Sequence, residues 1–224
     1  MLSKNILIVA PHADDETLGC GGTVLRAISE GHNVHWLLVT GMSVESGFSQ
    51  EQIETRKNEI DKVSTMYGFT STHELMLAPA MLETLPKGDI IGPILSVVNL
   101  VKPEDIYTVF RNDAHSDHEI VFDAVMSASK SFRHPFIKRV LAYETMSETD
   151  FGMKPGDGGF RPNVFIDITP HLSKKLDILE EFKSETGEFP FPRSRKALES
   201  LACVRGVQAN CNAAEAFMLL KEIQ

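Results

Sequence analysis

Apolar residues along the chain alternate between short continuous runs and amphipathic stretches, and this alternation predicts the secondary structure. Short apolar runs are typical of buried strands, and they lie at residues 6–10, 34–40, 75–77, 106–110, 140–143 and 164–168. Apolar residues three or four positions apart indicate helices, at residues 15–30, 53–67, 90–101, 121–128 and 172–182. Two further helical stretches are expected to finish the chain. Strands that alternate with helices are typical of an α/β fold with a mostly parallel sheet.

Capping residues mark the start of two of these helices. Ser116 followed by Glu119 fits a capping box, which places Ser116 at the N-cap and His118 in the first helical turn. Thr169 followed by Pro170 predicts a cap with proline at the first helical position. The first of these helices therefore begins inside a polar segment that directly follows a buried strand.

Composition favours one globular domain over residues 1–224. The length and the 42% hydrophobic content suffice for a single core, and no linker or internal repeat divides the chain. The net charge of −9 disfavours binding to nucleic acid or to an anionic membrane surface. No apolar run approaches the roughly 18 residues of a spanning helix, so we expect no membrane insertion. Homo-oligomerisation is left open.

The cysteines and the N-terminus indicate a cytoplasmic protein. The chain has 3 cysteines and none forms a CxxC pair, which suits a reducing compartment better than a disulfide framework. The first apolar run is too short for a signal peptide and lacks a small-residue cleavage site. We therefore interpret that run as the first strand.

The segment HADDETLGCGG, residues 12–22, follows the first strand and brings together one histidine and three acids. In an α/β protein, ligands bind at the end of a strand where the chain turns into a helix. The three glycines fall inside the predicted helix, where each costs about 1 kcal/mol relative to alanine. Such glycines indicate close packing on the sheet or on a ligand.

A second polar segment, RNDAHSDHE, follows the strand at 106–110. If the two strands lie close together in a parallel sheet, six side chains can converge at its carboxyl edge, namely His12, Asp14, Asp15, His115, Asp117 and His118. Two imidazoles and one carboxylate form a common catalytic zinc set and also suit ferrous iron. A further carboxylate would serve as general base, and a remaining histidine would stabilise an oxyanion. Spacing alone does not say which histidine is a ligand.

Two other interpretations compete with the metal site. The polar residues would cap helices and decorate a solvated loop, which is the ordinary explanation for any one of them alone. The glycines would form a nucleotide-binding loop, but GCGGT does not match GxGxxG and the preceding acids would repel a pyrophosphate. The presence of two such clusters, each after a buried strand, favours the metal site.

Four motifs resemble those of the PIG-L/LmbE-like deacetylases. HADDE with the following glycines is similar to the family's (A)HPDDE…GG signature, and HSDH at 115–118 is similar to its HPDH motif. RKNE at 56–59 resembles the family's Arg-x-x-Glu helix, and RG with the later AEAF resembles its C-terminal pattern. This resemblance spans essentially the whole chain. It implies a single Rossmann-like domain with a mostly parallel sheet and helices on both faces.

The resemblance also implies roles for individual residues. The implied metal ligands are His12, Asp15 and His118. Asp14 would be the general base that activates water. His115, oriented by Asp117, would stabilise the oxyanion. Zinc is the implied metal, with ferrous iron as an alternative.

Other positions are less clearly determined. Arg56 resembles the sugar-contacting arginine of the family, although an i,i+3 ion pair with Glu59 explains it nearly as well. Ala13 and Ser116 replace the usual prolines of the two motifs, which changes backbone stiffness and leaves the chemistry intact. Tyr143 is a candidate for a tyrosine near the scissile bond, and a core tyrosine is an equally good interpretation.

The predicted function is that of a zinc-dependent N-deacetylase, a hydrolase that acts on linear amide C–N bonds. It would hydrolyse the N-acetyl group of an N-acetylglucosamine-type sugar or conjugate, giving acetate and a free amino sugar. The partner is therefore a small molecule whose identity the sequence leaves open. The alternatives are a different metal-dependent amidohydrolase on the same scaffold, and a non-catalytic protein that binds a metal or a sugar.

Overall fold

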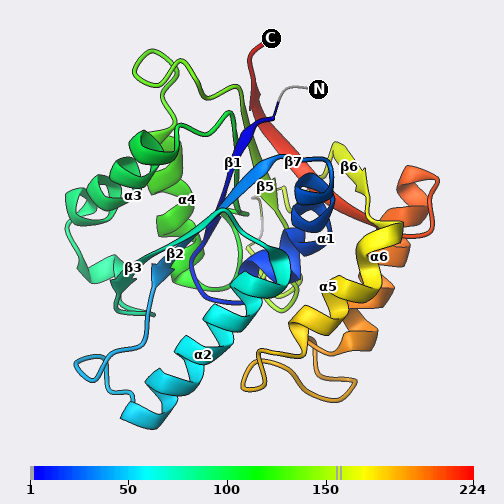
Figure 1. The fold of residues 1–224 in the computed structure, drawn as a ribbon, viewed down its shortest axis with the longest axis horizontal. Helices are drawn as coiled ribbons and strands as arrows, with labels where there is room; N and C mark the ends of the chain where they lie inside the picture. The colour runs from blue at the N-terminus through cyan, green and yellow to red at the C-terminus, as the bar shows by residue number, and fades with distance from the viewer. Residues whose placement is uncertain (1–2, 155, 157) are drawn as a thin grey trace.

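The computed structural model describes residues 3–154, 156 and 158–224 of the chain. Strands in this part of the chain are β1 (Asn5–Ala10), β2 (Asn33–Thr40), β3 (Ser71–Leu77), β4 (Asp105–Val109), β5 (Arg139–Tyr143), β6 (Val164–Asp167) and β7 (Ala214–Glu222). They form one sheet in the order β3-β2-β1-β4-β5-β7-β6 (Figure 1). β1 to β5 pair in parallel, and β7 is antiparallel to both β5 and β6. The predicted α/β fold with a mostly parallel sheet is confirmed.

Helices cover both faces of this sheet, as predicted (Figure 1). They are α1 (Asp15–Ser29), α2 (Gln50–Tyr67), α3 (Lys87–Val101), α4 (Ser116–Ala128), α5 (Leu172–Leu179) and α6 (Arg195–Ala209), with 3-10 turns η1 (Leu82–Thr84) and η2 (Thr169–His171). Alternate residues of β1 enter different cores, because successive side chains of a strand point to opposite faces. Ile8 packs with residues of α1 and α2, whereas Leu7 and Val9 pack with α3 and α4.

The strand order places the two polar segments at one edge. β1 lies between β2 and β4, so the chain builds the sheet outward first in one direction and then in the other. Ligand sites in such sheets lie at the carboxyl ends of the strands where the direction reverses. α1 begins just after β1 and α4 begins just after β4, and both junctions lie at this edge.

The C-terminal segment differs from the prediction. Of the two helical stretches expected after residue 193, the first is α6 and the second is the strand β7. The sequence AEAFMLLKE has good helix formers, but β7 is inserted between β5 and β6, where its first four residues are buried. Periodicity alone does not distinguish a short apolar run in a buried strand from one in a buried helix segment. Tertiary packing thus overrides helix propensity here.

Two predicted caps were also wrong in detail. Ser116 is the first residue of α4, and His115 is the N-cap, whose Nδ1 accepts a hydrogen bond from the backbone N–H of Asp117 at 3.1 Å. The imidazole nitrogen takes the place that the serine hydroxyl was expected to fill, and His118 still lies in the first turn. Thr169 lies inside η2 with Pro170, and Ile168 precedes that turn.

The glycines of α1 serve packing. A Cβ atom on Gly22 would lie 2.7 Å from the Ile168 side chain, and Gly19 and Gly21 face Tyr143 and Tyr67 even more closely. Larger side chains would therefore push α1 off its neighbours. The sequence suggested close packing of these glycines on the sheet or on a ligand, and the neighbours in the structure are side chains of the protein itself.

A kink interrupts α1 at Cys20, where φ is −139° and ψ is 17°. Beyond the kink, the backbone N–H groups of Gly22 and Thr23 donate to the Glu215 carboxylate at 2.8 and 2.7 Å. The buried Lys175 ammonium neutralises this carboxylate at 2.6 Å. The second half of α1 is thus capped by a side chain of β7, which satisfies amides that a helix start leaves unpaired.

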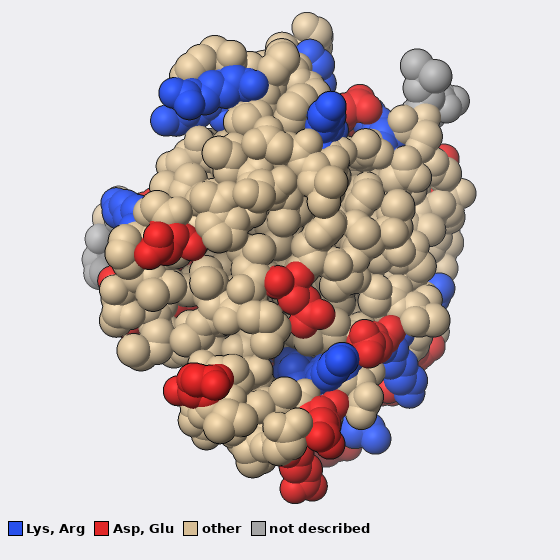
Figure 2. Space-filling view, turned by 60° about the vertical axis from the view of Figure 1, so that its left-hand side comes forward, with Lys and Arg blue, Asp and Glu red and all other residues tan. Residues whose placement is uncertain are grey.

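One face of the molecule has few charged side chains. On the face turned toward the viewer in Figure 2, most charged side chains are separated by uncharged residues, and acidic and basic ones lie side by side at the lower right. None of the helices in the described part of the chain has both the length and the apolar character needed to cross a membrane.

A candidate metal centre and its cavity

Three histidines from the two polar segments meet at the carboxyl edge of β1 and β4. The ring centroids of His12 and His115 are 4.4 Å apart, and those of His12 and His118 are 5.6 Å apart. Residues 12 and 115 are far apart in sequence, and the parallel pairing of β1 with β4 brings them together. The structure thus places both predicted polar segments in one cluster.

His12, Asp15 and His118 present their ligand atoms within 4.8 Å of one another. Asp15 Oδ2 lies 3.3 Å from both His12 Nδ1 and His118 Nε2. His118 Nε2 is buried and makes no hydrogen bond with any residue that the structure describes. Because a buried polar atom without a partner is costly, this nitrogen fits a role as a metal ligand. The donor set of two imidazoles and one carboxylate fits zinc or ferrous iron.

Carboxylates behind the histidines fix the orientation of their rings. His118 Nδ1 lies 2.8 Å from Asp113 Oδ2, and Asp113 Oδ1 accepts from the Thr149 hydroxyl at 2.6 Å. His12 Nε2 lies 3.0 Å from Asp117 Oδ2. Histidines that ligate metals characteristically donate their other ring N–H to a carboxylate in this way. Asp113 was not among the predicted site residues, although its place in the polar segment before His118 was a usable signal.

Asp117 has a different partner from the one that the family resemblance implies. Its Oδ2 atom is 3.0 Å from His12 Nε2 but 3.9 Å from His115 Nδ1. The same oxygen accepts the backbone N–H of Ala80 at 2.8 Å. His12, His115 and Asp117 also form a second group that is close enough to hold a metal ion. Both candidate groups contain His12. The first is completed by Asp15 and His118, and the second by His115 and Asp117.

Without a metal, the cluster holds protons tightly. Burial lowers the pKa of His12, but hydrogen bonds to Asp117 and Asp15 outweigh this effect and raise it to about 9. Burial likewise opposes protonation of His118, and the charge of Asp15 with the hydrogen bond to Asp113 raises its pKa to about 10. Metal binding must therefore release protons from these rings.

Asp14 lies beside the candidate metal group of His12, Asp15 and His118, and it has an unusual backbone conformation. Its φ of 150° is positive, which is rare for a residue with a side chain and costs energy that the surrounding contacts must offset. Its carboxylate is buried, and Oδ2 accepts from a guanidinium nitrogen of Arg193 at 2.8 Å. Burial and the charge of Asp15 raise the pKa of Asp14 to about 7, while Arg193 acts in the opposite direction.

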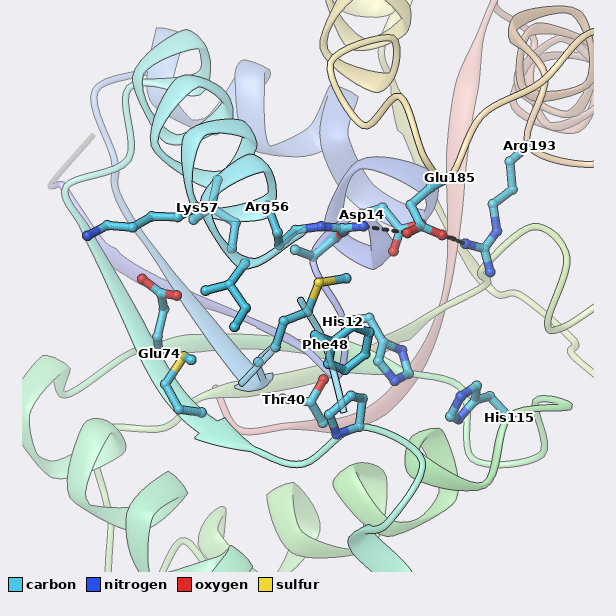
Figure 3. A pocket seen from close by; sticks show the side chains of 17 residues that line it. His12, Asp14, Thr40, Phe48, Arg56, Lys57, Glu74, His115, Glu185 and Arg193 are labelled. Carbon is cyan, nitrogen blue, oxygen red and sulfur yellow. Dashed lines mark hydrogen bonds and ion pairs between the residues drawn. The ribbon is translucent and has the colours of Figure 1, made fainter. Parts of the chain in front are cut away.

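Two arginines joined by Glu185 hold the Asp14 backbone and side chain in place. Arg56 donates to the carbonyl oxygen of Ala13 at 2.8 Å and forms an ion pair with Glu185. Glu185 Oε2 in turn lies 3.0 Å from Arg193, whose guanidinium binds Asp14 (Figure 3). Neither Glu185 nor Arg193 belongs to one of the four motifs, since both lie in an irregular segment between α5 and α6.

Arg56 forms the ion pair that the sequence suggested, and its contact with a sugar stays a prediction. Its Nε lies 3.2 Å from Glu59 Oε2, which is the expected i,i+3 pair. Its side chain also lines the cavity beside the metal group. Tyr143, in contrast, is fully buried and donates its hydroxyl hydrogen to the Val9 carbonyl at 2.9 Å, so it is a core tyrosine.

A cavity of about 550 Å³ opens onto this cluster. His12, Asp14, His115 and Arg193 line it at the carboxyl edge of the sheet, and Arg56 lines it from α2 (Figure 3). Its volume is within the range of pockets that enclose a small molecule, about 300–1,000 Å³.

The family model described as PIG-L, GlcNAc-PI de-N-acetylase, matches residues 7–129, which contain both polar segments. The chain belongs to the PIG-L family. The resemblance inferred from the four motifs is thereby confirmed, and membership supports hydrolytic deacetylation. The uncharacterized deacetylase YaiS of Escherichia coli K12 is 28% identical over 188 residues, covering 81% of this chain and 91% of that protein.

Solved structures share the fold at low sequence identity. N,N′-diacetylchitobiose deacetylase from Pyrococcus horikoshii has a TM-score of 0.77 at 18% identity and covers 98% of this chain and 84% of that chain. The 4-carboxy-2-hydroxymuconate hydratase GalB from Pseudomonas putida KT2440 has a TM-score of 0.74 at 18% identity, with 99% and 98% covered. These likenesses establish the fold alone, since a deacetylase and a hydratase both have it.

Proposed function

We propose that this PIG-L family member is a metal-dependent N-deacetylase that hydrolyses the N-acetyl group of an N-acetylglucosamine-type sugar or conjugate. The products are acetate and the free amino sugar. The observation that carries the proposal is the buried His118 Nε2, which makes no hydrogen bond with a described residue and faces Asp15 and His12, with the Asp14 carboxylate beside this group. The family model and the acetylated-sugar chemistry named for the Pyrococcus relative support the choice of substrate class.

The proposed metal ligands are His12, Asp15 and His118, with Asp113 and Asp117 orienting the two imidazoles. Zinc is the proposed metal, and ferrous iron suits the same ligands. When bound, such an ion supplies a Lewis acid that polarises a carbonyl oxygen and lowers the pKa of water to about 7.

Asp14 is the proposed general base. It is next to the ligand Asp15 and lines the cavity, so its carboxylate can take a proton from the attacking water. Burial raises its pKa to about 7, which suits a group that must accept and then release a proton near neutral pH. The hydrogen bond from Arg193 fixes the orientation of the carboxylate before the reaction.

His115 is the proposed oxyanion stabiliser. Burial lowers the pKa of His115, which favours the neutral ring. Its Nδ1 accepts the backbone N–H of Asp117, and a neutral imidazole then carries its hydrogen on Nε2. That N–H is free to donate to the carbonyl oxygen of the substrate as negative charge develops there. In this geometry the Asp117 backbone sets the tautomer of His115, and the Asp117 side chain orients His12.

Arg56 is the proposed substrate-binding residue, at the side of the cavity formed by α2. We also propose a cytoplasmic location, which is consistent with free thiols at Cys20, Cys203 and Cys211. The full chain, residues 1–224, is proposed as one functional domain.

The test combines metal analysis with an assay for amine release. The purified chain, stripped of metal and reconstituted with Zn²⁺ or Fe²⁺, is expected to bind one ion and to release acetate and a primary amine in equal amounts from acetylated amino sugars. Metal binding without amine release from any of these sugars would contradict the proposal, and would favour another reaction on the same fold.

Arg193→Met is expected to lower kcat about tenfold or more with unchanged metal content. A charge-assisted hydrogen bond contributes about 1.5–3 kcal/mol, and here it would fix the proposed base. Steady-state kinetics with an acetylated sugar, beside a metal assay, measure this effect. Arg195→Met is the matched control, because Arg195 lies two positions along and forms exposed pairs with Asp177 and Glu180. Equal loss in both variants would exclude a specific role for Arg193.

A further inference from the structure

The cavity continues beyond the proposed metal ligands, His12, Asp15 and His118, into a region with apolar walls. We call this region the apolar subsite, and it is lined by Met42, Phe48, Ile53, Ile60 and Met76. These residues come from the loop after β2, from α2 and from β3. None of them takes part in the proposed chemistry, so the subsite needs a separate explanation.

Met76, in the wall of the apolar subsite, has a strained backbone. It lies within β3, yet its φ of 56° is in the left-handed region that side chains disfavour. The pairing of β3 with β2 is irregular at this point, between Leu38 and Thr40. Strained residues of this kind persist where the surrounding structure holds them, and they are concentrated at ligand-binding sites. Asp14, the proposed base, is a second such residue on the wall of the same cavity.

Gly41 is adapted to the position of the Met76 side chain. A Cβ atom on Gly41 would lie 2.5 Å from Met76 Sδ, so a side chain at position 41 would displace the methionine from its present place. Met76 is nonetheless 48% exposed, because its other side faces the open cavity. Covering this exposed side chain with an apolar group of a ligand would be favourable.

Charge at the far end of the cavity argues against an anionic ligand. Lys57 and Glu74 line the side opposite to His115 and Arg193 (Figure 3). Their charges have opposite sign, and at the other end Arg56 and Arg193 are already paired with Glu185. The cavity therefore has no unpaired arginine that would select a phosphate or carboxylate group, and the occupant of the subsite should be uncharged.

The order of groups along α2 indicates which part of the substrate lies there. Ile53, Arg56 and Ile60 are three and four residues apart and therefore share one face of the helix. Arg56 lies between the two isoleucines on this face, so if the acetamide lies at the proposed metal ligands and the sugar at Arg56, the next group of the substrate contacts one of them. That group is the substituent on the sugar, the aglycone.

From this geometry we infer that the preferred substrate is an N-acetylated amino sugar joined to an uncharged, apolar aglycone. The inference rests on the proposed deacetylase function and specifies its substrate. Methionine-rich surfaces adapt to ligands of different shape, so the subsite suits alkyl and aryl groups alike.

The test compares three substrates with the metal-reconstituted full chain. They are free N-acetylglucosamine, octyl N-acetyl-β-glucosaminide and N-octanoylglucosamine. The octyl glycoside is expected to have a kcat/KM at least about tenfold above that of the free sugar, because even one methylene in an apolar pocket can change specificity about 10–200-fold. Most of the difference is expected in KM.

Two variants connect this preference to the subsite. Phe48→Ser and Met76→Ser are each expected to reduce the ratio of kcat/KM between octyl glycoside and free sugar at least about threefold, on the scale of one lost apolar contact. Leu100→Ser is the matched control, since Leu100 is an exposed apolar residue of α3 outside the cavity. Phe48 lies in a loop, so its variant tests the inference even if Met76→Ser does not fold.

Three outcomes would overturn the inference in distinguishable ways. Equal kcat/KM for octyl glycoside and free sugar would refute the subsite while leaving the deacetylase proposal intact. A preference for N-octanoylglucosamine would show that the subsite takes the acyl chain. No amine from any of the three would refute both proposals.

Discussion

Asp14→Asn is expected to lower kcat about 10²–10⁴-fold, the usual contribution of a general base, while the protein still binds one metal ion. Asparagine preserves the size of the side chain and an oxygen that can accept from Arg193. It removes the negative charge and with it the capacity to take a proton. Because Asp14 is not a member of either candidate metal group, metal content should not change. Turnover measured with an acetylated sugar, beside metal analysis of the same sample, checks both parts.

The matched control is Asp61→Asn, a change of the same kind on the exposed surface of α2. It should leave kcat and metal content as they are in the unmodified protein. If Asp14→Asn retained turnover, another group would be the base. If it lost metal together with activity, Asp14 would belong to the metal centre and the proposed division of roles at residues 14 and 15 would be wrong.

His118→Ala is expected to weaken metal binding by at least about 100-fold. Replacing a residue that only orients a ligand costs about 10–100-fold in affinity, so loss of a ligand should cost no less. His118 is buried, and its Nε2 lacks any other partner among the described residues. A competition titration against a chelator measures the affinity directly and does not depend on activity.

His115→Ala is the informative comparison for this variant. His115 belongs to the second candidate group, with His12 and Asp117, and not to the first. The proposal predicts that His115→Ala keeps its metal and loses turnover, whereas His118→Ala loses its metal. The reverse pattern would place the ion in the second group.

Much of the fold could be predicted because buried strands and amphipathic helices are encoded locally. The apolar run of β1 and the stripe of α2 depend on neighbours in sequence, so their periodicity is visible in the chain itself. β7 was missed because a short apolar run fits a buried helix segment as well as a strand, and its identity depends on β5 and β6 at its sides. Its location between them is a property of the folded chain.

The residues of the candidate site could likewise be predicted where they lie in a local sequence motif, and not where they depend on tertiary contacts. The two polar segments were recognisable because each holds several functional side chains within a few residues after a strand. Asp113 is part of one of these segments, but its contact with His118 depends on the turn geometry. Glu185 and Arg193 reach Asp14 only through tertiary structure, from an irregular segment far along the chain. The spacing of residues in the sequence carries no information about such contacts.

The capped kink of α1 has a consequence for how the protein is made. The amides of Gly22 and Thr23, just beyond the HADDE motif, receive their acceptor from Glu215, near the end of the chain. During synthesis from the N-terminus, the second half of the first helix can therefore be capped only after residue 215 has been made. Contacts between such distant residues slow folding, because a long loop must close before they can form. We expect the start of the chain to be among the last parts to reach its final structure.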